Sequence, residues 1–111
     1  MMRYLKNIGG MGEQFAAEML TNSGYEIIGR NYMTKRGEID IIALKDGILH
    51  FIEVKTRTSD RYGSPAESVT RVKQQRMRRA AEQYIQGRRL YWRNVSFDVF
   101  EINANLIENC I

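Results

Sequence analysis

Hydrophobic and polar residues alternate through the middle of the chain in the manner of β-strands. Segments 38–44 and 48–56 are rich in Ile, Leu, Val and Phe, and a Lys-Asp-Gly sequence separates them. Asp-Gly is among the strongest local signals for a two-residue hairpin turn. Segments 25–32 and 95–102 have a similar apolar character. The pattern therefore predicts four strands, the middle two joined as a hairpin.

Two other segments have the spacing of three and four residues that is typical of amphipathic helices. The first follows flexible glycines near the N-terminus and ends near Gly24. Its apolar arc consists of Phe15, Ala16, Met19 and Leu20. The second spans 66–87 and follows an irregular, loop-like stretch that contains Pro65. Its expected core-facing residues are Val69, Val72, Met77, Ala80, Ala81, Tyr84 and Ile85.

The order helix, strand, strand, strand, helix, strand predicts an α/β domain, with helices packed on a mixed sheet. A length of 111 residues suits one hydrophobic core, so we expect a single domain over 1–111. We expect loosely ordered tails at 1–8 and 103–111.

The residue types limit where in the cell the protein is expected and which kind of metal site it can hold. No apolar run approaches the roughly 20 residues needed to span a bilayer, and the N-terminus lacks the apolar core of a secretory signal. Cys110 is the lone cysteine, which fits a reducing cytoplasm. His50 is the lone histidine, so an ordinary Cys/His zinc site is excluded and any metal must be held by oxygen ligands. We expect a cytoplasmic protein without a membrane partner.

The register of the hairpin places two acids opposite each other. If Asp46 and Gly47 form the turn, antiparallel pairing and a side-chain period of two fix which residues share a face. One face pairs Leu44 with Leu49, Ile42 with Phe51, Asp40 with Glu53 and Glu38 with Lys55. The other pairs Ala43 with His50, Ile41 with Ile52 and Ile39 with Val54.

Asp40 and Glu53 are thus expected to face one another with Cβ atoms about 4.5–5.5 Å apart. Two carboxylates at that separation destabilise the sheet unless one keeps a proton or a cation lies between them. Mg²⁺ or Mn²⁺ suits the position, because such hard ions take oxygen ligands and leave room for water and phosphate. Lys55, on the same face, could orient a water or stabilise charge on a phosphate.

Three further residues are candidates for the same site. Glu13 lies on the apolar side of the first helix, near Ala16 and Ala17 on a helical wheel, and could be a third ligand or a base. Glu38 is expected to support the site by pairing with Lys55. Gln75, like Lys73, could position a water or a phosphate, with a solvated place on the helix as the alternative for both.

Each acid also has a purely structural interpretation. Asp40 could cap the end of a strand, and Glu53 could pair with Lys55 or Lys35 on the surface. We favour a functional site, because opposed acids, a Lys on the same face and a Glu on an apolar helix face occur together.

Positive charge is concentrated in the second helix and the loop before it. The formal net charge of +4 favours anionic partners only weakly, and a solvated helix face is the alternative interpretation. The residues assigned to nucleic-acid contact are Arg57, Arg61, Arg71, Lys73, Arg76 and Arg79.

The acids and the lysine form a recognisable pattern. An Asp followed on the next strand by Glu-x-Lys, in "GEIDII" and "FIEVKTR", resembles the PD-(D/E)xK core of the restriction-endonuclease-like fold, with a layout close to archaeal Holliday junction resolvases. With "GGMGEQFAAEML", "YGSPAESV" and "FDV", the chain resembles the YraN family of uncharacterised bacterial proteins over residues 9–102. That resemblance implies active-site positions at Asp40, Glu53 and Lys55, with Glu13 as the helical acid. Ile39 replaces the Pro of the motif name, a position that varies widely.

Three functions follow as hypotheses. The first is a Mg²⁺-dependent nuclease acting on DNA, including branched DNA, with Asp40, Glu53 and Glu13 as metal ligands. The second is a nucleic-acid-binding module of the same fold without catalysis, and the third is an adaptor for a protein partner. Symmetrical cleavage of two strands would require a second copy, so a homodimer is one expected state.

Overall fold

A computed structural model of the chain describes residues 2–57, 70–88 and 94–103. It contains two helices and four strands in the predicted order. Their bounds are α1 Met2–Asn22, β1 Glu26–Met33, β2 Glu38–Lys45, β3 Ile48–Arg57, α2 Arg71–Gly87 and β4 Val95–Asn103.

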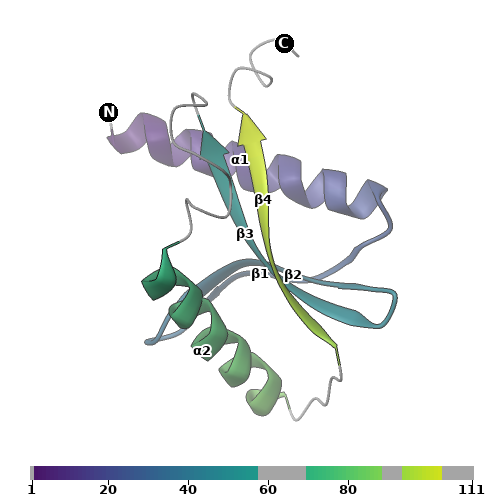
Figure 1. The fold of residues 1–111 in the computed structure, drawn as a ribbon. Helices are drawn as coiled ribbons and strands as arrows, with labels where there is room; N and C mark the ends of the chain where they lie inside the picture. Colours follow the sequence, from purple (N-terminus) through teal and green to yellow (C-terminus); the bar gives the residue numbers. More distant parts are fainter. Residues whose placement is uncertain (1, 58–69, 89–93, 104–111) are drawn as a thin grey trace.

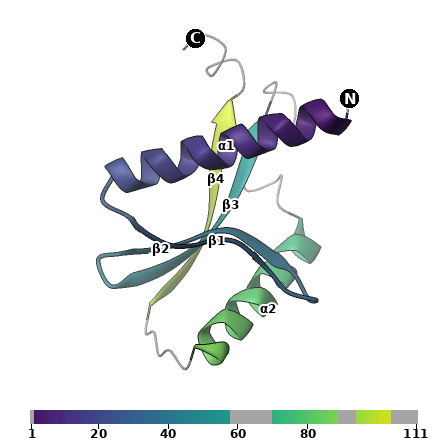
Figure 2. The ribbon, with the colours of Figure 1, turned by 180° about the vertical axis from the view of Figure 1, so that it is seen from behind.

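The four strands form one mixed sheet in the order β1-β2-β3-β4. Strands β1, β2 and β3 are antiparallel, and β4 is parallel to β3. The parallel step requires a crossover, which α2 provides. Helix α1 lies on one face of the sheet and α2 on the other (Figures 1 and 2). The predicted α/β class is confirmed.

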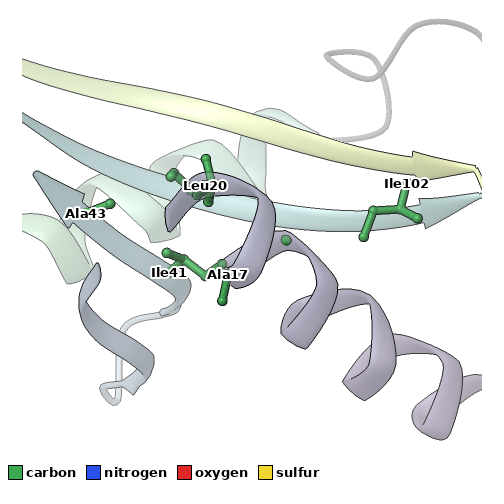
Figure 3. Packing of buried hydrophobic residues seen from close by; sticks show 7 residues of the cluster. Ala17, Leu20, Ile41, Ala43 and Ile102 are labelled. Carbon is green, nitrogen blue, oxygen red and sulfur yellow. The ribbon is translucent and has the colours of Figure 1, made fainter. Parts of the chain in front are cut away.

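The core beneath α1 is built from small helix residues and branched strand residues. Ala16, Ala17 and Leu20 pack on Ile41 and Ala43, together with residues of β3 and β4 (Figure 3). The alanines allow the helix to approach the sheet closely. One turn before Ala16, a Cβ atom on Gly12 would lie 2.5 Å from Thr56 Oγ1, so this glycine permits a similarly close contact between α1 and β3.

The core beneath α2 is larger in side-chain volume. Phe51 and Leu49 from the sheet are fully buried against Ala80, Ala81 and Tyr84 of the helix. Ile39 and Ile42 complete this cluster. The two clusters confirm that β2 and β3 are covered on both sides, as their continuous apolar character predicts.

Several boundary and burial expectations were wrong. Helix α1 begins at Met2 rather than after the glycines, because glycine weakens a helix without forbidding it and packing can outweigh propensity. Phe15 and Met19 are 42% and 43% exposed, since the buried arc of α1 is centred between Ala16 and Leu20.

In the second helix, α2 begins at Arg71 rather than near residue 66. Thr70 is the N-cap of α2, and its hydroxyl accepts a hydrogen bond from the Lys73 N–H at 3.2 Å. Val72 is 57% exposed, because the first buried residue of α2 is Met77, five residues later. Val69 and Pro65 lie outside the described residues, as do 104–111 of the predicted C-terminal tail.

Within the described ranges, neither helix is long and apolar enough to cross a membrane.

Candidate active site where strands β2 and β3 separate

The turn end of the β2–β3 hairpin has the predicted register. The pairs run from Lys45 with Ile48 to Ile41 with Ile52. Asp46 and Gly47 have φ angles of 52° and 76°, so both are left-handed, as a two-residue turn of type I′ requires. The sequence therefore predicted this end of the hairpin correctly.

The alternation breaks at Asp40. The β2–β3 ladder ends with the Ile41–Ile52 pair, so Asp40 and Glu53 are not paired through their backbones as predicted. Ile39 packs in the α2-side core with Ile42, whereas strict alternation would place it with Ile41. On β1, the residue opposite this break is Asn31, which has a φ of 51°. An irregularity on both strands thus shifts the faces beyond Asp40, which a strict period of two cannot represent.

The side chain of Asp40 replaces the missing ladder contact. Its Oδ2 accepts a hydrogen bond from the backbone N–H of Val54 at 2.8 Å. The carboxylate therefore lies between β2 and β3, at the point where their pairing stops. This bond also satisfies a backbone donor that the separation of the strands would otherwise leave without its ladder partner.

Glu53 lies next to Asp40, as the sequence predicted, although by another geometry. Its side chain is only 15% exposed. Burial, then the negative charge of Asp40, and also a hydrogen bond between the two carboxyl groups raise the pKa of Glu53, to a net value of about 7. Lys73 and Lys55 lower it in part. Near neutral pH the pair thus holds a proton for part of the time, at a position where a cation would relieve the same repulsion.

Two lysines from different elements meet beside Glu53. Lys55 follows it on β3, and Lys73 reaches from α2, with its Nζ 3.9 Å from Glu53 Oε1. Burial lowers the pKa of Lys55, and so do a hydrogen bond and like-charge repulsion from Lys73, while the two acids oppose this shift. The arrangement places one exposed and one half-buried ammonium next to two carboxyl groups.

Glu13 approaches the same region from α1. Burial raises its pKa, the charge of Asp40 raises it further, Arg30 lowers it, and Glu38 adds a small increase. Glu38 is exposed on β2. Over the described ranges Glu38 forms no ion pair with Lys55, so the predicted cross-strand bridge is absent.

Asp40 and Glu53 provide part of a ligand set for a divalent metal ion. Within residues 2–57, 70–88 and 94–103, no three Asp, Glu, His or Cys side chains converge into a complete ligand set. Asp40 and Glu53 do offer two adjacent hard oxygen donors, and one Asp40 oxygen does not take part in the Val54 bond. Mg²⁺ often uses one or two carboxylates, with waters and substrate phosphate as its other ligands. The pair fits such a site, and Glu13 does not complete it in this conformation.

The residues expected to contact nucleic acid divide into three groups. Lys73 and Arg76 line a cleft beside Glu53. Arg71 and Arg79 are exposed on α2 and do not line that cleft, and the same holds for Gln75, which was expected to support the site. Arg57 is the last residue of β3, and Arg61 lies outside the described residues.

The sequence assigned Lys73 to nucleic-acid contact, with the positioning of a water or a phosphate as a second possibility, and did not place it against Glu53. A signal for that position was present. Lys73 lies one helical turn before Met77, the first buried residue of α2, so it occupies the border of the packed face.

His50, the lone histidine, lies away from the Asp40–Glu53 pair. Its Nδ1 is 2.7 Å from Asp98 Oδ2, and Ser96 donates a hydrogen bond to the other oxygen of Asp98. Its ring also meets Tyr25 edge to face. These contacts account for His50 as a structural residue linking β3 to β4.

Comparisons with known proteins extend over nearly the whole chain. Residues 12–102 match the model of a family described as "Uncharacterised protein family UPF0102". A "UPF0102 protein" of Clostridium perfringens is 48% identical over 106 residues, which cover 96% of this chain and 87% of that protein. One from Chlorobaculum parvum is 50% identical, covering 91% and 78%, and one from Symbiobacterium thermophilum is 54% identical, covering 72% and 68%. None of these names states an activity.

Proposed function

The chain belongs to the uncharacterised protein family UPF0102, and from the site that it carries we propose that it is a metal-dependent nuclease that hydrolyses DNA phosphodiester bonds. The observation that carries the proposal is the adjacency of Asp40 and Glu53 where β2 and β3 separate, with Lys55 and Lys73 beside them. The bond from the Val54 N–H gives Asp40 a structural role, but that role does not account for the carboxyl group of Glu53 placed against it where sheet pairing stops.

Asp40 and Glu53 would hold a divalent ion, Mg²⁺ or Mn²⁺. Such an ion polarises the phosphate and lowers the pKa of a bound water. The hydrogen bond from the Val54 N–H fixes the orientation of the Asp40 carboxylate. Glu13, on the α1 side of Asp40, adds negative charge that favours a cation nearby.

The lysines would act on the substrate. Because its pKa is lowered, the Lys55 amine can accept a proton from the attacking water more readily than an ordinary lysine. Lys73 would donate a hydrogen bond to the phosphate oxygens, on which negative charge develops as the water oxygen bonds to phosphorus and the bond to the sugar oxygen breaks. Exposed Arg71, Arg76 and Arg79 on α2 would contact the phosphate backbone without reading sequence.

The test is cleavage of a panel of linear, flapped and four-way DNA substrates with Mg²⁺ or Mn²⁺. We expect metal-dependent cleavage by the wild type, and a loss of about 100-fold or more for Asp40→Asn and Lys55→Ala. Glu82→Gln, a change at an exposed α2 residue, is the matched control. Cleavage that persists in Lys55→Ala at the wild-type rate would indicate a contaminating nuclease.

A thermal titration separates the proposal from its alternatives. Mg²⁺ or Mn²⁺ should raise the melting temperature of the wild type and not that of Asp40→Asn, because ligands stabilise the state that binds them. Salt-sensitive DNA binding without a metal shift or cleavage would indicate the non-catalytic binding module. Absence of all three responses would favour the adaptor.

A further inference from the structure

A cleft adjoins the acids on the α2 side of the sheet. It has a volume of about 390 Å³ and lies between the turn that joins β1 to β2 and the first half of α2. Both views show this turn beside α2 (Figures 1 and 2). Glu53 and Glu38 are part of its lining, so the cleft opens directly onto the proposed site of hydrolysis.

The turn forms a fixed wall. Thr34 Oγ1 accepts hydrogen bonds from the N–H groups of Arg36 and Gly37 at 3.1 and 3.0 Å, and the Thr34 N–H donates to the Gly37 carbonyl at 2.8 Å. A Cβ atom on Gly37 would overlap the backbone carbonyl oxygen of Arg76 and lie 2.8 Å from its carbonyl carbon. The turn and α2 are therefore in close backbone contact, and the width of the cleft is set by a glycine.

Positive charge dominates the lining. Lys35 and Arg36 come from the turn, and Lys73 and Arg76 from α2. Over the described ranges, Lys35, Arg36 and Arg76 form no ion pair. The opposing acids are Glu38 and Glu53, and the second of these has its pKa raised to about 7. The cleft thus suits an anion such as a phosphodiester group of a nucleic-acid backbone.

The lining of the cleft also contains apolar side chains against which an aromatic ring can pack. Met33 is 72% exposed at the rim, the most exposed large hydrophobic residue described, and Met77 lies in the wall. Methionine side chains are flexible and polarizable, and they contact aromatic rings favourably. Cations for a phosphate and thioethers for a base are the two chemistries that one nucleotide requires.

We propose that this cleft binds one nucleotide of single-stranded DNA and thereby presents the adjoining phosphodiester to Asp40 and Glu53. The inference rests on the proposed nuclease function and names its substrate class. The volume is at the lower end of the ~300–1,000 Å³ typical of small-molecule pockets, which suits a nucleotide and excludes a duplex. The DNA therefore enters as a flap, a frayed end or an unpaired strand at a branch.

Binding in EDTA tests the cleft independently of cleavage. Fluorescence anisotropy would compare a labelled single-stranded oligonucleotide, a hairpin duplex of equal length and the RNA version of the strand. Met33→Ser should weaken single-strand binding by about tenfold, and Met11→Ser, at an exposed Met on α1, should not. Because neither substitution alters charge, general electrostatic attraction cannot produce this difference.

A second pair of variants tests the phosphate contacts. Arg36→Ala should weaken single-strand binding by about tenfold, and Arg78→Ala, which removes an equal charge at an exposed α2 residue outside the cleft, by less than threefold. Circular dichroism would verify that each variant is folded.

Equal effects within each pair, or a duplex bound more tightly than the single strand, would overturn the inference. RNA bound at least tenfold more tightly than DNA would overturn the choice of DNA. Failure of the nuclease proposal gives a different result, namely intact cleft-dependent binding with no metal-dependent cleavage.

Discussion

The two ends of the β2–β3 hairpin differ in how they use the same kind of sequence. At the turn end, five residue pairs follow a regular ladder, and Phe51 and Leu49 are completely buried. At the other end the ladder stops at Ile41 and Ile52, and a side-chain carboxylate takes the next hydrogen bond. One end stabilises the fold, and the other gives up sheet pairing to hold acids that repel each other.

This difference shows how a small domain supports a strained site. A fully buried carboxylate pair would cost several kcal/mol of a typical stability of about 5–15 kcal/mol, and the partial exposure of Asp40 and Glu53 reduces that cost. The apolar clusters on both faces lie directly beside the break, because Asp40 is flanked in sequence by Ile39 of one cluster and Ile41 of the other. The stabilising contacts and the destabilising ones thus share a strand.

The largest expected effect comes from breaking the regular end. Phe51→Ala should lower the free energy of unfolding by about 3–5 kcal/mol, because the ring is fully buried against Tyr84 and stacked on Phe97. Urea denaturation followed by circular dichroism measures the change. Phe97→Ala, which removes a ring that is 37% exposed, should cost clearly less. Equal costs would mean that the buried end does not dominate stability.

A smaller effect is expected where pairing stops. At pH 5, Asp40→Ala should lower the free energy of unfolding by about 1–3 kcal/mol, because the Val54 N–H loses its acceptor. Asp40→Asn keeps an acceptor oxygen and should recover part of that loss. The same urea series would measure both variants, and identical losses would contradict a role for this hydrogen bond in closing the gap.

The smallest expected effect concerns the pH dependence of Glu53. Its pKa rises from an ordinary 4.5 to about 7 on folding, so its contribution to stability is complete below about pH 4.5 and is lost as the pH rises through 7. Glu53→Gln should therefore be more stable than the wild type by about 1 kcal/mol at pH 8, with no such gain at pH 4. This figure is reduced from the full shift because solvent screens a partly exposed group.

Urea midpoints measured from pH 4 to pH 8 would test this prediction. Glu82→Gln, at an exposed position on α2, should give a curve parallel to the wild type. A Glu53→Gln curve parallel to the wild type would show that the Asp40–Glu53 pair carries no linked proton.

Local signals in the sequence determined the element order, the hairpin turn and the register near it. Those features depend on neighbouring residues, on turn chemistry and on a strict period of two, all of which can be read along a chain. The same period failed at Asp40 on β2. The left-handed Asn31 lies on β1, and Val54, which donates the hydrogen bond to Asp40, lies on β3, so neither can be read from the sequence of β2. The burial of Val72 and Phe15 was misjudged for a related reason, since helix periodicity gives the arc but not its centre.

The sequence by itself thus supplied Asp40, Glu53 and Lys55 and their nearness along one hairpin. Only the tertiary structure decided that Asp40 lies between strands, that Lys73 joins from α2, and that the β1–β2 turn forms a cleft with that helix. The physical reason is that these contacts join residues far apart in the sequence, which no local pattern covers. The last two also depend on where α2 packs, and a close approach at Gly37 and a core around Phe51 fix that packing.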